Sequence, residues 1–182
     1  MNNPIIILEG LDRTGKSTLA NQLANHFGPG AIKHHSGSPP KHLTYPQNLI
    51  WEENNYYLLM EAFNKASRFN TVVIDRFHLG CPVFGKRYRK YPETVTTETL
   101  ERQMCIGYNT FLVLLTDDSE ELFKRDDGLS FEKSADDFDK TCTEFIKEFS
   151  NSTIDNKLHI NITKNGGFSQ SLPSILKFIE SV

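Results

Sequence analysis

Residues 9–18 read EGLDRTGKST, and this stretch decides how the chain folds. Gly10 to Ser17 match the phosphate-loop pattern G-x-x-x-x-G-K-[ST] at every fixed position. The pattern works only between a strand and a helix, and both flanks fit it. Residues 4–8 (PIIIL) are an apolar run typical of a buried parallel strand, and apolar residues recur at helical spacing over 19–27. We therefore expect a strand, a phosphate-binding loop and a helix, in that order.

The chemistry of this loop follows from its residue types. Gly10 and Gly15 allow backbone turns that a Cβ would block, so that N–H groups converge on phosphate oxygens at the positive end of the following helix. Lys16 can reach the outer phosphates of a nucleotide, and the Ser17 hydroxyl can hold Mg²⁺. A chance match in a glycine-containing turn is the alternative, and the two flanks argue against it. A nucleoside triphosphate is therefore the expected ligand.

Composition bounds the class of protein. The 182 residues suffice for one domain with a sizeable core, and 38% hydrophobic with 24% charged residues is typical of a soluble globular chain. A net charge of −3 provides no global basic field for nucleic acid. Cys81, Cys105 and Cys142 lie far apart, which argues against a disulfide framework or a zinc site and favours a reducing cytoplasm. No apolar run approaches the length of a membrane span, so no membrane partner is expected.

Predicted strands and helices alternate along the rest of the chain. Strands are expected near 4–8, 31–34, 71–74, 111–115 and 157–162, and helices over about 16–27, 44–67, 97–105, 119–125, 135–149 and 171–179. Residues 77–97 contain Pro82, Gly85, Pro92 and many threonines and are predicted to be irregular. The alternation predicts an α/β fold, a three-layer P-loop NTPase sandwich with a parallel five-stranded sheet and helices on both faces. Right-handed crossovers would gather the phosphate loop and the loops after 34, 74 and 162 at one sheet edge.

Residues 9–18 closely resemble the phosphate loop of thymidylate kinases, a family of nucleoside monophosphate kinases. Residues 72–77 (VVIDRF) look like that family's strand ending in Asp-Arg-Tyr/Phe, and residues 112–125 look like its fourth strand, next helix and lid. The resemblance implies one kinase domain, with a lid at about 124–137, that transfers the γ-phosphoryl group of ATP to a nucleoside monophosphate with the help of Mg²⁺. It also implies a cytoplasmic enzyme, of a bacterium or a virus-infected host cell. Because members are commonly homodimers, a second copy is one implied partner.

The resemblance also assigns roles to single residues. Arg13 looks like the catalytic arginine that some members carry inside the loop, and Asp12 would touch the acceptor sugar or phosphate. Arg76 would contact the acceptor phosphate, and Asp75 would act through the Mg²⁺ shell. An exposed rim position for Arg13, a loop-stabilising turn at Asp12 and a structural Asp75–Arg76 ion pair are the plain alternatives. The residues implied to bind ATP are Gly10, Asp12, Arg13, Thr14, Gly15, Lys16, Ser17 and Thr18. The implied catalytic set is Lys16, Arg13, Asp12 and Arg125, and the implied metal ligands are Ser17 and Asp75.

Three residues are candidates for holding the acceptor. Trp51 precedes Asp75 by 24 residues, the spacing at which an aromatic of the family stacks on the acceptor base, and Asn55 shares its helix face where the family usually has a base-reading arginine. Stacking plus one amide makes a sensible base pocket, while core packing of Trp51 is the alternative. Residues 34–41 lack the family's phosphate-gripping arginine, so that hydroxyls such as that of Ser36 would serve instead. These departures indicate a divergent member, of the trimmed kind found among viral nucleotide kinases.

Two other functions stay open at the level of sequence. A kinase with a hydroxyl acceptor, a free deoxynucleoside or a nucleotide within DNA, needs a general base, which Glu9 or Asp12 can supply. The basic stretch 86–91 (KRYRKY) interleaves cations with aromatics, as single-stranded nucleic acid requires, although a solvated face is its ordinary meaning. The same stretch could also help to hold a phosphate-bearing acceptor. A non-catalytic nucleotide switch is the third possibility, but the chain has no obvious D-x-x-G switch outside the phosphate loop and no N-K-x-D motif.

Overall fold

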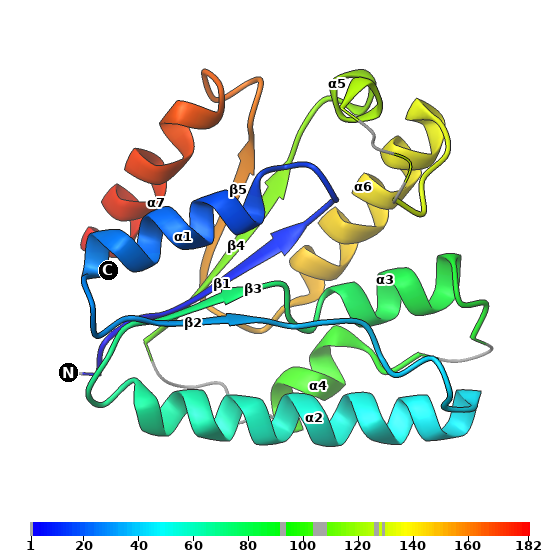
Figure 1. Cartoon of the computed structure of the whole chain (residues 1–182), viewed down its shortest axis with the longest axis horizontal. Helices are drawn as coiled ribbons and strands as arrows, with labels where there is room; N and C mark the ends of the chain where they lie inside the picture. The colour runs from blue at the N-terminus through cyan, green and yellow to red at the C-terminus, as the bar shows by residue number, and fades with distance from the viewer. Residues whose placement is uncertain (1, 92–93, 104–108, 126–127, 129) are drawn as a thin grey trace.

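Five parallel strands form a single sheet in the order β2-β3-β1-β4-β5 (Figure 1). A computed structural model describes residues 2–91, 94–103, 109–125, 128 and 130–182. The central strand β1 pairs with β3 on one side and β4 on the other, and β2 and β5 form the edges. The predicted parallel five-stranded sheet is therefore confirmed. The strands are β1 Ile5–Gly10, β2 Ile32–His35, β3 Val72–Asp75, β4 Thr110–Thr116 and β5 Asn156–Asn161.

Helices cover both faces of this sheet (Figure 1). Alternation along β1 sends Ile6 and Leu8 into a core formed with the first and last helices, while Ile5 and Ile7 enter the core of the opposite face. On the first face lie α1 Lys16–Phe27 and α7 Ser171–Glu180, preceded by the short η1 Phe168–Gln170. On the second face lie α2 Tyr45–Ala66, α3 Gly80–Arg87, α4 Thr97–Gln103 and α6 Ala135–Asn151. The remaining helix, α5 Ser119–Lys124, follows β4. No helix in the described part of the chain is long and apolar enough to cross a membrane.

The helix α3 corrects the expectation of irregular structure over 77–97. Pro82 is the third residue of α3, inside the first turn, where a backbone N–H has no partner within the helix. Gly85 is tolerated in the interior of α3 because a close contact needs it: a Cβ there would lie 2.8 Å from Cγ2 of Thr94. Both residues break helices when judged by local propensity, and here tertiary packing overrides that preference.

The loops after four strands gather at the carboxyl edge of the sheet, as predicted. The backbone N–H of Arg76 donates to the carbonyl of Leu8 at 2.9 Å, which joins the end of β3 to the end of β1. The N–H of Ser36 donates to the carbonyl of Asp75 at 3.1 Å, and that of Ile162 to Thr116 at 2.9 Å. Parallel strands that end together place their following residues in one crevice, where ligands of such sheets bind.

Candidate active site

The phosphate loop depends on its two glycines for steric reasons. Gly10 has φ +128° and lies against the neighbouring strand β4, where a Cβ would come within 1.9 Å of the carbonyl oxygen of Leu115. Gly15 has φ +77°, and a Cβ there would lie 2.4 Å from the ring of Phe168. The left-handed conformation of Gly15 leads directly into α1, so the loop N–H groups and the helix N-terminus converge. This is the geometry that holds an anion.

Lys16 is a cation confined under this loop, with only 3% of its surface exposed. Its Nζ donates to the carbonyl oxygen of Leu11 and, at 3.4 Å, to Oγ1 of Thr14. Burial and, to a smaller extent, the positive charge of Arg76 lower the pKa of Lys16 to about 8, although nearby carboxylates led by Asp12 oppose the shift. Phosphate oxygens entering the loop would favour the charged amine, so nucleotide binding and protonation of Lys16 are coupled.

Ser17 and Asp75 face each other across the loop. The Ser17 hydroxyl donates to Oδ2 of Asp75 at 2.5 Å, and Nδ1 of His35 lies 3.0 Å from the same oxygen. The second oxygen of Asp75 is buried and has no hydrogen-bond partner among the described residues. A hydroxyl plus a carboxylate suits Mg²⁺, which takes few protein ligands and completes its shell with water and phosphate. The described residues hold no larger cluster of three or more His, Cys, Asp or Glu side chains that could bind a metal ion.

Asp12 and Arg76 form an ion pair at the mouth of the crevice. The distance from Nη2 of Arg76 to Oδ1 of Asp12 is 2.5 Å, and both side chains keep access to solvent. Arg76 has φ +66°, an uncommon value for a residue with a side chain, because its N–H is tied to β1 directly after β3 ends. Its Nε has no hydrogen-bond partner among the described residues, so the guanidinium can accept an additional anionic ligand.

Arg13 links the phosphate loop to the segment predicted as a lid. It has φ +68°, its Nε donates to Oγ of Ser130 at 3.2 Å, and its Nη1 donates to the carbonyl oxygen of Arg125. Arg125 is fixed in turn, because its Nη2 lies 2.9 Å from Oδ2 of Asp117. Burial acts to raise the pKa of Asp117, but the hydrogen bonds from Thr163, the N–H of Asp118 and Arg125 together leave that pKa lowered. Two arginines therefore stand beside the loop that would carry the triphosphate.

A cavity opens between the phosphate loop and α3. Its charged wall contains Glu9, Asp12 and Arg76, and its apolar wall contains aromatic rings from several helices. Ser36 lies in the cavity wall too, and its buried hydroxyl has no partner among the described residues. The residues that line the cavity are Glu9, Gly10, Asp12, His35, Ser36, Gly37, Ser38, Pro39, Tyr56, Arg76, Phe77, Gly80, Cys81, Phe84, Arg89, Phe131 and Phe145.

The structure does not bring Trp51 and Asn55 to this cavity, and this corrects the expected acceptor site. Both lie in a separate shallow hollow on the outer side of α2, with Leu43, Gln47 and Leu58. The buried residues Glu52 and Tyr56 occupy the next positions along the helix, and Tyr56 lines the cavity. One residue corresponds to about 100° of rotation around a helix, so this small offset exchanges the inner face for the outer one.

Several residues of the cavity were not singled out from sequence. Phe84 and Phe131 lie with ring centroids 5.8 Å apart, and Arg89 lies in the same wall. Helical periodicity could have indicated Tyr56 as an inward-facing residue, because the buried positions of α2 repeat at 48, 52, 56, 60 and 63. The basic stretch 86–91 pointed to Arg89 only as one of several cations, and no local pattern placed Phe84 or Phe131 in the site. Their shared location arises only when α3 packs beside α6.

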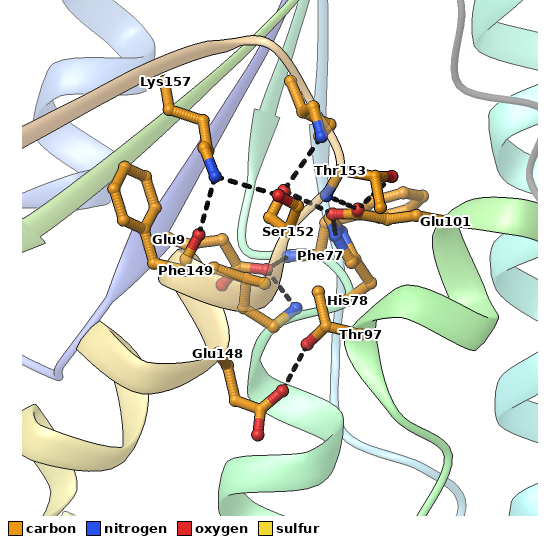
Figure 2. Close-up of polar contacts among 12 residues, drawn as sticks. Glu9, Phe77, His78, Thr97, Glu101, Glu148, Phe149, Ser152, Thr153 and Lys157 are labelled. Atoms are coloured by element: carbon orange, nitrogen blue, oxygen red, sulfur yellow. Dashed lines mark hydrogen bonds and ion pairs between the residues drawn. The ribbon is translucent and has the colours of Figure 1, made fainter.

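A buried polar network fastens the loop after β3 (Figure 2). Oε1 of Glu9 accepts hydrogen bonds from the backbone N–H groups of Phe77 at 2.9 Å and Leu79 at 2.8 Å, and burial raises the pKa of Glu9. Between those two residues, Nε2 of His78 lies 2.8 Å from Oε1 of Glu101, and both side chains are completely buried. The segment that carries Arg76 is therefore held from β1 on one side and from α4 on the other.

Comparison with solved structures shows what kind of fold this is. The YorR protein from Bacillus subtilis, in complex with phosphorylated GDP, has a TM-score of 0.66 and 22% identity, over 97% of this chain and 95% of that one. Thymidylate kinase from Candida albicans has a TM-score of 0.66 and 15% identity, over 99% and 92%. Deoxyadenosine kinase from M. mycoides with bound dCTP has a TM-score of 0.59 and 12% identity, over 97% and 99%. No protein-family model and no curated protein matches the sequence. With a complete phosphate loop at the edge of a parallel sheet, this chain has the α/β fold of the P-loop kinases.

Proposed function

We propose that this protein is an ATP-dependent kinase whose acceptor is a nucleoside monophosphate. The observation that carries the proposal is the placement of the Asp12–Arg76 pair between the phosphate loop and an aromatic cavity. An acceptor with an anionic end and a flat apolar end fits this arrangement, because Arg76 offers donors to a phosphate while Tyr56 and Phe84 flank a base. The kinases among the structures of similar fold, which include thymidylate kinase, support the same reading.

Phosphoryl transfer requires charge compensation and alignment more than covalent chemistry. Lys16 and the loop N–H groups would hold the outer phosphates of ATP, and Ser17 with Asp75 would hold Mg²⁺, which would supply positive charge to compensate that of the phosphates. Arg13 would lie across the transferred group as a bidentate donor. Asp12 and Ser36 would position the acceptor beside Arg76.

We further propose that the segment 124–137 acts as a lid. Arg125 would leave Asp117 for the phosphates when the lid closes, and closure would exclude water from the transferred group. Trp51 and Asn55 have no part in this mechanism, because they lie in another hollow.

A hydroxyl acceptor is the second candidate, and Glu9 is the observation that favours it. Its carboxylate is buried, lines the cavity, and has a pKa raised by burial, as a general base near neutral pH requires. Against this role, Oε1 of Glu9 already accepts two backbone N–H groups, which is what a structural carboxylate does. A free deoxynucleoside would also bring no phosphate to the Nε of Arg76, which has no hydrogen-bond partner among the described residues.

ADP release with a panel of acceptors tests the two candidates. The protein is incubated with ATP and Mg²⁺ and with each common ribo- or deoxynucleoside monophosphate, each free nucleoside, or single-stranded DNA. Turnover with monophosphates, and a KM for them that rises at least about tenfold in Arg76→Met, is the expected result. Arg68→Met, in the exposed turn that follows α2, is the matched control and should change nothing. Turnover with nucleosides or DNA alone would overturn the proposal in favour of the hydroxyl acceptor.

A further inference from the structure

The turn after α3 directs an arginine into the cavity. Arg89 belongs to the basic stretch 86–91, yet it lines the cavity, and its Nη1 donates to Oε1 of Glu52 at 3.0 Å. Glu52 is buried with 1% of its surface exposed, so this ion pair lies at the inner wall of the cavity. The neighbouring Lys86 remains exposed at the surface. The stretch is therefore no continuous basic face, because Arg89 is turned inward.

The backbone of this turn is held in an uncommon conformation. Lys90 has φ +55°, and the other described non-glycine residues with positive φ are Arg13 and Arg76, both beside the phosphate loop. The N–H of Arg89 donates to the carbonyl of Phe84, and that of Tyr91 to the carbonyl of Gly85, both at 3.0 Å. Strained backbone persists where the surrounding structure fixes it, and such positions concentrate at ligand sites. The turn is built to point Arg89 into the cavity.

Glu52 determines what Arg89 can recognise. Burial raises the pKa of Glu52, and the positive charge of Arg89 opposes this shift. Because the pair is partly removed from water, each charge is stabilised by the other, and loss of one would leave the other without its counter-ion. A guanidinium carries five N–H donors in a rigid fork and no acceptor, and the bond to Glu52 engages one nitrogen. The remaining nitrogens can bind only a hydrogen-bond acceptor on whatever fills the cavity.

Aromatic rings line the same cavity as Arg89. Phe84 and Phe131 both contribute to its lining, with ring centroids 5.8 Å apart. Tyr88 supports Phe131 by stacking on its ring, with centroids 5.0 Å apart and planes inclined by 19°. An acceptor with its phosphate on Arg76 would place its base along these rings. A carbonyl group on the base would accept from Arg89, whereas an amino group at the same position would present a second donor to it.

We propose that Arg89, held by Glu52, reads a carbonyl group on the acceptor base. The protein then prefers bases with oxygen at purine position 6 or pyrimidine position 4 over adenine and cytosine, which carry an amino group there. The inference rests on the proposed function, since it names the substrate class of that same cavity. The inference can be told apart from the proposed function because it predicts a preference within pairs of nucleotides that differ only in this oxo or amino group.

Two matched pairs test it: dIMP against dAMP, and dUMP against dCMP. Steady-state kcat/KM is measured for all four with the wild type, Arg89→Met, and the control Lys86→Met, which alters an exposed cation on the preceding helix α3. The wild type and the control should prefer the oxo member of each pair by about 10- to 100-fold. Arg89→Met should lose this preference through a fall in kcat/KM for dIMP and dUMP, with dAMP and dCMP nearly unchanged.

Because Arg89→Met leaves Glu52 buried without its cation, the double variant Arg89→Met/Glu52→Met is made as well and should show the same loss. An unchanged preference in a folded variant would overturn the inference and leave the proposed function intact. An equal fall for all four nucleotides would also overturn it, since Arg89 would then serve the phosphate. If the wild type phosphorylates no monophosphate, the proposed function fails, and calorimetric binding of the same four nucleotides decides the inference by the same ratios.

Discussion

Replacing Glu101 should test how the loop that carries Arg76 is held in place (Figure 2). Its carboxylate accepts from Nε2 of His78 at 2.8 Å, from Oγ of Ser152 at 2.7 Å, and from the N–H and Oγ1 of Thr153 at 2.5 and 2.8 Å. Glu101→Ala removes all four contacts. Thr153 is exposed and recovers water, whereas His78 and Ser152 are buried and do not.

Two buried donors left without an acceptor, at roughly 1–3 kcal/mol each, predict a loss of about 3–5 kcal/mol in the free energy of unfolding. This is a large share of the ~5–15 kcal/mol of a typical domain. Urea denaturation followed by circular dichroism measures it. Glu98→Ala, also on α4 but in an exposed pair with Arg102, is the matched control and should cost no more than about 0.5 kcal/mol.

The pH dependence sharpens this prediction. Burial acts to raise the pKa of Glu101, but the hydrogen bonds and charge of His78, with the bonds from Ser152 and Thr153, leave it lowered below the usual 4.5. A carboxyl whose pKa is depressed on folding stabilises the protein above its unfolded pKa and loses that contribution as the pH falls through its folded pKa. The gap between wild type and Glu101→Ala should therefore shrink below about pH 4.5. A loss below 1 kcal/mol at pH 7, or a gap that widens in acid, would refute the reasoning.

Three further predictions concern the site itself. Arg13→Ala should cut kcat by roughly 10³-fold while ATP affinity measured by calorimetry stays within a few-fold, because the arginine acts on the transferred group; retained kcat would remove it from catalysis. ATP affinity should fall as the pH rises above about 8, because Lys16 then loses its proton. Lys16→Arg should abolish this pH dependence, and identical pH profiles for the wild type and Lys16→Arg would contradict the coupling. Trp51→Ala should leave the KM of the acceptor within about twofold, because Trp51 lies in the outer hollow of α2; a tenfold rise would restore the role expected from the sequence.

The phosphate loop and the sheet could be predicted from the sequence because their signals are local. A single turn requires Gly10, Gly15 and Lys16 at a fixed spacing, so the phosphate loop can be recognised from a few neighbouring residues. An apolar run as short as 111–115 fits a buried strand but is too short for a helix. The convergence of Asp75 and Arg76 on that loop then followed from the parallel order of the strands. Each of these inferences depends on a few neighbouring residues and on rules that hold for every parallel sheet.

The acceptor cavity was decided by the tertiary structure. Helix α3 forms despite Pro82 and Gly85, because packing compensates for poor local propensity, and its end turns Arg89 toward the buried Glu52. Which face of α2 points inward depends on how that helix packs. The inward position is that of Glu52, whereas Trp51, one residue earlier, lies in the outer hollow. The sequence by itself determined that this chain carries a phosphate-loop motif at the edge of a parallel sheet. Only the folded chain determined which side chains line the proposed acceptor cavity, since that cavity joins residues that are far apart along the sequence.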